Sequence, residues 1–103
     1  MPTKGGYLGC YKDDRWQRDL VGFTTNFPTM TGGACVDLCR TKGFRYAATQ
    51  YGQHCFCGNE FGKYGKASNC DMKCGGSATE TCGGNSANSV YAVSGAVPAG
   101  TSR

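Results

Sequence analysis

Apolar residues in this chain gather in short stretches that predict three regions of β-strand. The first is "GGYLGCYKDD", which alternates around Cys10. The second covers residues 44–51, and "HCFCG" at 54–58 continues or extends it after a break at Gly52. The third is "NSVYAV", residues 88–93. Together these stretches predict a small sheet of short strands.

One helix is predicted between the first two strand regions. Thr31 suits the N-cap position, the helix continues to about Lys42, and Gly43 suits the residue that follows the C-cap. The apolar stripe of this helix consists of Ala34, Cys35, Leu38 and Cys39. This stripe is the face that we expect to pack against the rest of the domain.

The second half of the chain, from 58 to 84, is rich in glycine and polar residues. A short helical turn is predicted near "NCDMKC", residues 69–74. "SATE", residues 77–80, matches a capping box, in which a glutamate side chain accepts a hydrogen bond from a backbone N–H. Glu80 is therefore interpreted as a structural residue rather than as an acid catalyst.

Length and composition indicate one exported, cross-linked domain. A chain of 103 residues buries only a small core, and this one has eight cysteines, an even number that is typical of a disulfide framework. We expect the domain to cover 7–93, after an N-terminal extension over 1–6 and before a C-terminal linker over 94–103. No signal peptide or stretch of membrane-spanning length is visible, which predicts a module of a longer secreted or surface-anchored protein without direct membrane insertion.

Charge and cysteine spacing argue against nucleic-acid and metal partners. The formal net charge is only +4, and the lysines and arginines are scattered rather than clustered. Structural zinc sites usually present two close pairs of ligands separated by roughly a dozen residues or more. Here the spacings are C-x3-C, C-x-C and C-x3-C, with one histidine, His54. We therefore expect no metal and no cofactor.

Catalytic groups in the usual arrangements are not found in the sequence. A pair made of His54 with Cys55 or Cys57 needs a free thiolate, which disulfide bonding removes. Asp13 and Asp14 are adjacent and lack the spaced partner that a glycosidase requires, so they are interpreted as solvated loop charges. The sequence therefore predicts a protein that is not an enzyme.

The cysteine spacings fit a helix that is bonded to a strand. On a helix, Cys35 and Cys39 lie about 6 Å apart along one face. On a strand, Cys55 and Cys57 lie roughly 6.6 Å apart on one face. Two disulfides side by side can therefore join the two pairs, and this spacing leaves their polarity open. The remaining bonds that this reasoning favours are Cys74 to Cys82 and Cys10 to Cys70.

Several longer motifs fall in the order of a known family. They are "YLGCYKD", "MTGGACVDLCRTKGFRYAATQYGQHCFCGN", the cysteines at 70 and 74, and "ETCGGNSANSVY". With them the chain resembles the WSC domain, the cysteine-rich module of fungal cell-wall integrity sensors and secreted fungal oxidases. The resemblance implies a small α+β fold of the PAN/apple-like kind, with an antiparallel sheet packed against one main helix. It also implies four disulfides, namely Cys10–Cys70, Cys35–Cys55, Cys39–Cys57 and Cys74–Cys82.

Sugar-binding surfaces combine flat aromatic side chains with hydrogen-bonding groups, and the chain has candidates for both. Trp16 lies among charges in "DDRWQRD" and is interpreted either as an exposed platform or as a lid folded over the core. The further aromatic candidates, each next to a glycine, are Tyr51, Tyr64 and Phe61. The candidate hydrogen-bonding partners are Gln50, Asn59, Asp13 and Asp14. The aromatics assigned mainly to core packing are Phe44, Tyr46, Phe56 and Tyr91.

The resemblance implies binding of cell-wall polysaccharide such as β-1,3-glucan, chitin or xylan. We therefore expect a non-catalytic carbohydrate-binding module, secreted or on the extracellular face of the cell surface, that attaches its parent protein to a fungal or plant wall. The alternative is a protein-interaction module, in which surface aromatics mediate self-association of a wall sensor or contact another extracellular protein.

Overall fold

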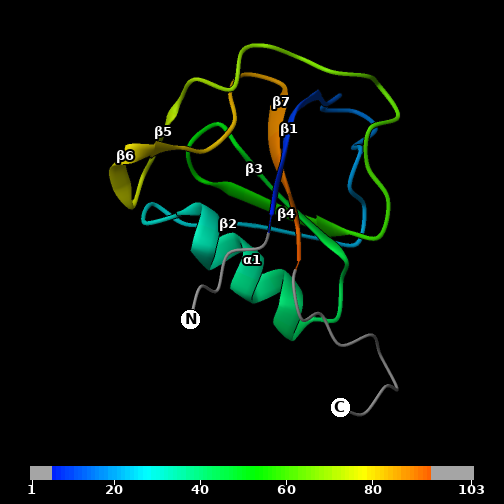
Figure 1. Ribbon diagram of the computed structural model, residues 1–103, viewed down its shortest axis with the longest axis horizontal. Helices are drawn as coiled ribbons and strands as arrows, with labels where there is room; N and C mark the ends of the chain where they lie inside the picture. Colours follow the sequence, from blue (N-terminus) through cyan, green and yellow to red (C-terminus); the bar gives the residue numbers. More distant parts are fainter. Residues whose placement is uncertain (1–5, 94–103) are drawn as a thin grey trace.

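The computed structural model describes residues 6–93. Within this range it has seven strands and one helix, joined by loops (Figure 1). In chain order they are β1 (Tyr7–Lys12), β2 (Phe23–Asn26), α1 (Gly32–Thr41), β3 (Tyr46–Gln50), β4 (His54–Gly58), β5 (Lys73–Cys74), β6 (Ser77–Thr81) and β7 (Ala87–Ala92). Five strands form one antiparallel sheet in the order β1-β7-β3-β4-β2, and β5 and β6 form a separate hairpin. The predicted α+β class, with an antiparallel sheet and one helix, is confirmed. Apart from Gly6, the expected N-terminal extension and C-terminal linker lie outside the described residues.

The register of the central strand β3 decides which side chains share a face of the sheet. Gln50 of β3 lies opposite His54 of β4, and Thr49 lies opposite Ser89 of β7. Successive side chains of a strand point to opposite faces, so Gln50 and His54 lie on one face while Cys55 lies on the other. The helix covers the face that carries the cysteine.

Helix α1 begins and ends where the sequence predicts. The Thr31 hydroxyl accepts a hydrogen bond from Ala34 N at 3.0 Å, and Gly43 follows the C-cap with a left-handed φ of 86°. The predicted apolar stripe is partly wrong, because Ala34 is exposed whereas Val36 is buried. Two disulfides from the helix to β4 fix its rotation about its own axis, so the buried face is the one that carries these cysteines and Val36. No helix within residues 6–93 is long and apolar enough to cross a lipid bilayer.

The chain reverses direction between β3 and β4. Tyr51 and Gly52 in this turn both have left-handed backbone, with φ angles of 54° and 79°. A Cβ atom on Gly52 would lie 2.8 Å from Lys73 O, so the position also demands a residue without a side chain. The predicted break at Gly52 is confirmed. The prediction that residues 54–58 continue the same strand is wrong, because successive left-handed residues fold the chain into a tight hairpin.

The predicted helical turn near residues 69–74 is also wrong. The last two residues of this segment form β5, which pairs with β6. The disulfide from Cys74 of β5 to Cys82, the residue after β6, holds the Cα atoms of these two cysteines 4.8 Å apart. A bond across so short a loop favours an extended hairpin over a helical turn in this segment.

Residues 77–80 do not form a capping box, because they are extended in β6. Glu80 nevertheless binds a backbone N–H group, as its sequence interpretation expects. Its Oε1 atom accepts a hydrogen bond of 3.3 Å from Gly32 N, at the first turn of α1. Glu80 therefore caps a helix that is distant in sequence, which a local motif could not reveal.

Four disulfides join the elements in the pairing that the family resemblance implies. They are Cys10–Cys70, Cys35–Cys55, Cys39–Cys57 and Cys74–Cys82. The second and third bond α1 to β4, with Cα separations of 5.5 and 5.3 Å. The helix is consequently held on one side of the sheet (Figure 1).

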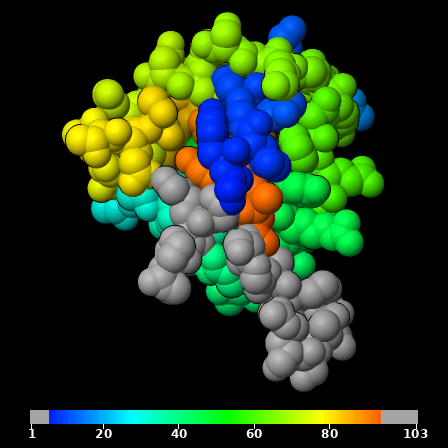
Figure 2. Space-filling model, viewed as in Figure 1, coloured from blue at the N-terminus to red at the C-terminus, as the bar shows by residue number. Residues whose placement is uncertain are grey.

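The sheet has an apolar core on each face. Beneath α1 the core is built largely from cysteines, with Met30 and Val36. On the opposite face it is built from Leu20, Ala48, Phe56 and Val90, with Tyr11, Tyr46 and Phe61 packed against them. The predicted core aromatics are confirmed, since Phe56 and Tyr91 are buried and Phe44 and Tyr46 pack against the two cores. The loops after β1 and β4 supply Leu20 and Phe61, so loops rather than a helix cover this second face. Figure 2 shows β1 (blue) on the surface, partly covering β7 (orange).

Candidate functional site

A hollow of about 460 Å³ lies where three distant segments meet beside the β3–β4 turn. The segments are the loop after β1, the β3–β4 hairpin and the turn before β7. The lining residues are Arg15, Arg18, Gln50, Tyr51, His54, Asn85 and Ser86. We call this site the Tyr51 hollow. It lies at the polar end of the sheet face that the helix leaves uncovered.

Asp13 holds the three segments of the Tyr51 hollow together. Its Oδ1 atom accepts a hydrogen bond from Asp19 N at 2.8 Å, which closes the loop after β1. Its Oδ2 atom accepts bonds from Gln50 Nε2 at 2.7 Å and from Arg18 Nη1 at 2.8 Å. Asp13 N donates to Ser86 O at 3.0 Å, which adds the turn before β7. The Asp13 side chain has no exposed surface, so it positions the site and does not reach a ligand itself.

Arg18 is fixed in place beside the hollow. In addition to Asp13, its Nη1 atom donates to Gln50 Oε1 at 3.3 Å, and its guanidinium carbon lies 4.8 Å from the centroid of the Phe56 ring. About a third of the Arg18 side chain remains exposed. The ion pair and the aromatic contact therefore orient a guanidinium that still faces solvent.

The surroundings of His54 disfavour its protonated form. Its ring stacks on Phe56 with an interplanar angle of 13° and a centroid distance of 6.2 Å. Burial, followed by the charge of Arg18, lowers the pKa of His54 from its ordinary value of 6.5. A neutral imidazole offers one N–H donor and one nitrogen acceptor, which suits it to hydroxyl groups.

Two residues of the hollow have a strained backbone. Among residues 6–93, Tyr51 and Ser86 are the two non-glycine residues with positive φ, at 54° and 53°. Such conformations cost free energy and cluster at functional sites. The exposed fraction of Tyr51 is 54%, and its ring centroid lies 6.4 Å from that of His54. An aromatic face is therefore kept at the rim of a polar hollow.

Trp16 is exposed and is not a lid over the core, because its exposed fraction is 85%. The guanidinium carbon of Arg15, which lines the hollow, lies 5.7 Å from the centroid of the Trp16 ring. Asp14 Oδ1 accepts a hydrogen bond of 2.8 Å from Trp16 N and so shapes the turn that carries the indole. Of the two interpretations that the sequence leaves open, the structure excludes the lid.

The other predicted site residues divide into two groups. Gln50 lines the hollow as Tyr51 does, but its amide already binds Asp13, Arg18 and Asn88. Phe61 and Asn59 line a different hollow of about 400 Å³, beside Val21. The sequence therefore groups residues that the structure separates.

The second group, Phe61, Asn59 and Tyr64, does not line the Tyr51 hollow, and its members have packing and hydrogen-bonding roles within the fold. Phe61 makes edge contacts with Tyr11 and Tyr46, at centroid distances of 5.0 and 4.7 Å. Asn59 Oδ1 accepts a hydrogen bond from the backbone N–H of residue 45 at 2.9 Å. The Tyr64 hydroxyl donates to Gln17 O at 2.5 Å and so supports the loop after β1. These contacts give the three residues structural roles outside the Tyr51 hollow.

Five lining residues were not predicted from the sequence. They are Arg15, Arg18, His54, Asn85 and Ser86. Their sequence signals were weak, since both arginines lie in the charged loop around Trp16 and Asn85 and Ser86 belong to no motif. Their convergence depends on β-strand register and on the bonds of Asp13, which sequence spacing does not encode.

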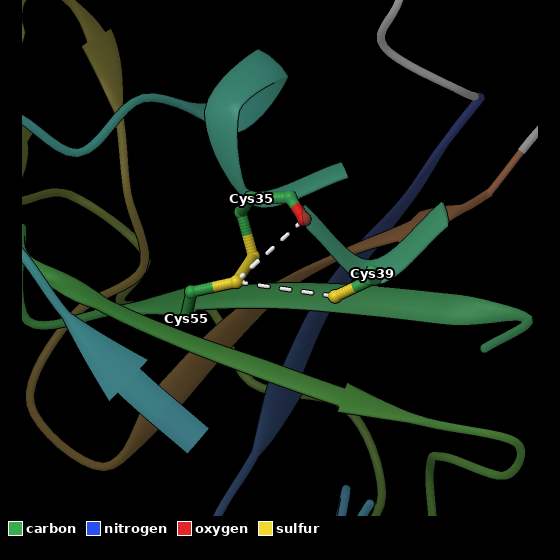
Figure 3. Close-up of side chains that lie close together, drawn as sticks. All are labelled: Cys35, Cys39 and Cys55. Carbon is green, nitrogen blue, oxygen red and sulfur yellow. Dashed lines mark hydrogen bonds between the residues drawn. A yellow bond between two sulfur atoms is a disulfide. The ribbon is translucent and has the colours of Figure 1, made fainter. Parts of the chain in front are cut away.

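Three sulfur atoms gather beneath α1 in a way that superficially resembles a metal site (Figure 3). The sulfurs of Cys35, Cys39 and Cys55 lie within 4.8 Å of one another, and those of Cys39 and Cys55 are 3.9 Å apart. Every cysteine within residues 6–93 is in a disulfide, and Figure 3 draws the one between Cys35 and Cys55. These sulfurs therefore carry no proton, and the dashed contacts from the Cys55 sulfur to the Cys39 sulfur and to the Cys35 carbonyl oxygen are packing contacts. Zinc binding and cysteine nucleophiles both require a thiolate, which these residues do not offer.

Comparisons with known proteins agree on one family. The family model described as "WSC domain" matches residues 7–84. Xylosyltransferase oxt of Drosophila pseudoobscura pseudoobscura is 42% identical over 90 residues, which cover 82% of this chain and 10% of that protein. Kremen protein 1 of Homo sapiens is 38% identical over 84 residues, covering 78% of this chain and 18% of that protein. Kremen protein 2 of Homo sapiens is 37% identical over 93 residues, which cover 86% of this chain and 20% of that protein. The chain thus spans between a tenth and a fifth of the length of these relatives.

Proposed function

The chain belongs to the WSC domain family, and from that premise we propose that it is a non-catalytic carbohydrate-binding module. It attaches its parent protein to cell-wall polysaccharide of the β-1,3-glucan, chitin or xylan type. The four disulfides support a secreted or cell-surface location, because such bonds persist in oxidising compartments. The three relatives compared above are animal proteins.

The observation that carries the proposal is the aromatic ring of Tyr51 at the rim of a polar hollow. A pyranose ring has apolar C–H faces and polar edges, so it suits an aromatic surface flanked by donors and acceptors. Tyr51 and Trp16 supply exposed rings, and His54 and Asn85 supply hydrogen-bonding groups. The strained backbone of Tyr51 supports the same role, because a ring kept at such a position is costly to fold.

The site is small and open to solvent, which sets the expected strength of binding. Each hydrogen bond to a sugar replaces one to water and contributes about 0.5–1.5 kcal/mol. We therefore propose single-site dissociation constants of about micromolar to millimolar. Retention on a wall then comes from repeated sugars along the polymer, or from several modules on one parent chain.

A retention assay tests this proposal directly. The purified domain is mixed with insoluble β-1,3-glucan, chitin or xylan, and the bound fraction is measured after sedimentation. Near-ultraviolet circular dichroism establishes that the domain is folded. We expect retention on at least one polymer and a clear loss for Tyr51→Ala.

Tyr7→Ala is the matched control for this assay. Tyr7 is exposed to a similar extent, at 57%, but it lies at the start of β1 and does not line the hollow. Retention of this variant should match that of the original domain. A folded domain that none of the polymers retains would refute the proposed function.

Self-association is the second candidate, and one observation favours it. β1 is an edge strand of the sheet, and its Tyr7 and Leu8 are exposed apolar residues. An exposed apolar edge is a ready surface for pairing with a second copy. Sedimentation velocity without sugar would then show an apparent mass that rises with concentration.

Since the chain spans only a tenth of the xylosyltransferase, we propose no transferase activity for it.

A further inference from the structure

We infer that the Tyr51 hollow selects acidic glycans, in which a uronic acid carboxylate is bound by Arg15 and Arg18. This inference rests on the proposed carbohydrate binding and names the class of sugar. Its basis is the charge around the hollow, which the neutral polymers considered above do not use.

Arg15 is the first of the two cationic groups. Its side chain lines the hollow, and residue 15 as a whole is exposed. Within residues 6–93 it takes part in no ion pair, and its recorded contact is the one with the Trp16 ring at 5.7 Å. A guanidinium that makes a cation–π contact with an aromatic ring and has no acidic partner is available to bind the anionic group of a ligand.

Arg18 supplies a second guanidinium, which is held rigidly. Both of its recorded hydrogen bonds, to Asp13 and Gln50, use the Nη1 atom. An arginine side chain has five N–H donors, so three others remain beyond those two bonds. Bidentate binding of a carboxylate needs two parallel N–H groups of this kind.

Acidic groups are placed where they do not compete for the two arginines. None of the residues that line the hollow is an aspartate or a glutamate. Asp13 is buried and serves as the internal partner of Arg18. Asp14 does not line the hollow, and its Oδ1 atom accepts a hydrogen bond of 2.8 Å from Trp16 N.

The remaining walls of the hollow suit a sugar that carries one carboxylate. The Tyr51 ring lies at the rim, and Asn85 and Ser86, from the turn before β7, also line the hollow. The volume of about 460 Å³ is within the ordinary range for small-ligand sites. One carboxylate on the arginines and one ring face on Tyr51 would fix the orientation of the sugar.

The test compares one polymer in two chemical forms. Glucuronoxylan is used as such and after its uronic carboxyl groups have been reduced to alcohols, so that the backbone is unchanged. Binding of the purified domain to each form is measured by affinity electrophoresis. We expect the acidic form to bind about tenfold more tightly, since a charge-assisted hydrogen bond is worth roughly one decade in affinity.

Two arginine variants and one further polymer complete the test. Arg15→Gln should lower the ratio of the two affinities several-fold, whereas Arg45→Gln, an equal charge change at an exposed residue outside the hollow, should not. Dextran sulfate serves to detect general attraction to anions.

The outcomes separate the inference from the proposed function. Equal affinity for the two xylan forms overturns the inference and leaves carbohydrate binding standing. A preference that Arg45→Gln reduces as much as Arg15→Gln, or dextran sulfate binding as tight as that of glucuronoxylan, also overturns it, because net charge would then explain the result. A folded domain that binds none of the polymers overturns both.

Discussion

Tyr51 keeps a large side chain at a backbone position that favours glycine. Its φ of 54° lies in the left-handed region, which costs an ordinary residue about 1–2 kcal/mol. The ring is more than half exposed, so packing does not repay this cost. Binding at the rim of the hollow gives a physical reason for the residue, and stability and binding should therefore oppose each other here.

Tyr51→Gly should stabilise the fold while removing binding. Glycine adopts this backbone without strain, and after its larger entropy in the unfolded chain is subtracted we expect a gain of about 0.5–1 kcal/mol in the free energy of unfolding. Polysaccharide retention should fall in the same variant. Tyr51→Ala is the control, since it should lose retention with no gain in stability. Denaturant unfolding with intact disulfides measures the first quantity, and a loss of stability in Tyr51→Gly would contradict the prediction.

His54 should make the fold less stable in mild acid. Burial, followed by the charge of Arg18, lowers its pKa, so the folded protein binds fewer protons here than the unfolded chain does. The contribution of His54 to the free energy of unfolding is therefore fully present above about pH 6.5 and is lost as the pH falls through the folded-state pKa.

The comparison with His54→Gln isolates this contribution. Unfolding by denaturant is measured at about pH 7.5 and about pH 5 for the original domain and for the variant. Every other titrating group is common to the two proteins, so a difference in their loss of stability reports His54. We expect the loss of stability in acid to be smaller in His54→Gln. An equal loss in the two proteins would show that His54 does not contribute.

At the scale of the elements, two side chains accept hydrogen bonds from backbone N–H groups at the N-terminus of α1. Thr31 caps it locally through Ala34 N, and Glu80 of β6 reaches Gly32 N from a distant part of the chain. The four first N–H groups of a helix have no partners within the helix, so both contacts contribute to its stability. The first was visible in the sequence because a capping residue acts on its near neighbours. The second depends on where the β5–β6 hairpin lies.

Thr31→Ala should lower the free energy of unfolding by about 1 kcal/mol, the usual cost of removing a helix N-cap. Thr41→Ala is a control at the other end of α1, where an exposed hydroxyl donates to Asp37 O at 2.9 Å. The control should change stability by less than about 0.5 kcal/mol. Equal effects of the two substitutions, measured by denaturant unfolding, would contradict the role of Thr31.

At the scale of the whole molecule, disulfides compensate for a small core. The core beneath α1 consists largely of bonded cysteines, and the second core is covered by loops. The disulfides differ in the length of chain that they close, with sequence separations from 8 for Cys74–Cys82 to 60 for Cys10–Cys70. In the chain-entropy account, a longer closed loop gives greater stabilisation.

Removing these two disulfides should therefore have unequal effects. We expect the Cys10→Ala, Cys70→Ala double variant to lose about 4 kcal/mol and the Cys74→Ala, Cys82→Ala double variant to lose about 2.5 kcal/mol. Denaturant unfolding under non-reducing conditions compares them. The reverse order would show that native packing around the shorter loop, rather than loop entropy, dominates.

The sequence by itself determined the features that depend on near neighbours in the chain. The limits of α1 follow from Thr31 and Gly43, and the spacings of the cysteines match a helix bonded to a strand. Four aromatics in the predicted strands, Phe44, Tyr46, Phe56 and Tyr91, were correctly assigned mainly to core packing. Helix capping, the spacing of cysteines and the alternation of apolar and polar residues each involve residues that are close in the chain. Each can therefore be recognised in the sequence without knowledge of the rest of the fold.

Only the tertiary structure decided how distant segments meet. The reversal at Gly52 turned a predicted continuing strand into a hairpin, and this reversal placed Gln50 opposite His54. Asp13, interpreted from the sequence as a solvated charge, became the buried residue that joins three segments. The Tyr51 hollow exists because strand register and a few long-range hydrogen bonds bring together residues whose separation in sequence carries no signal of their contact.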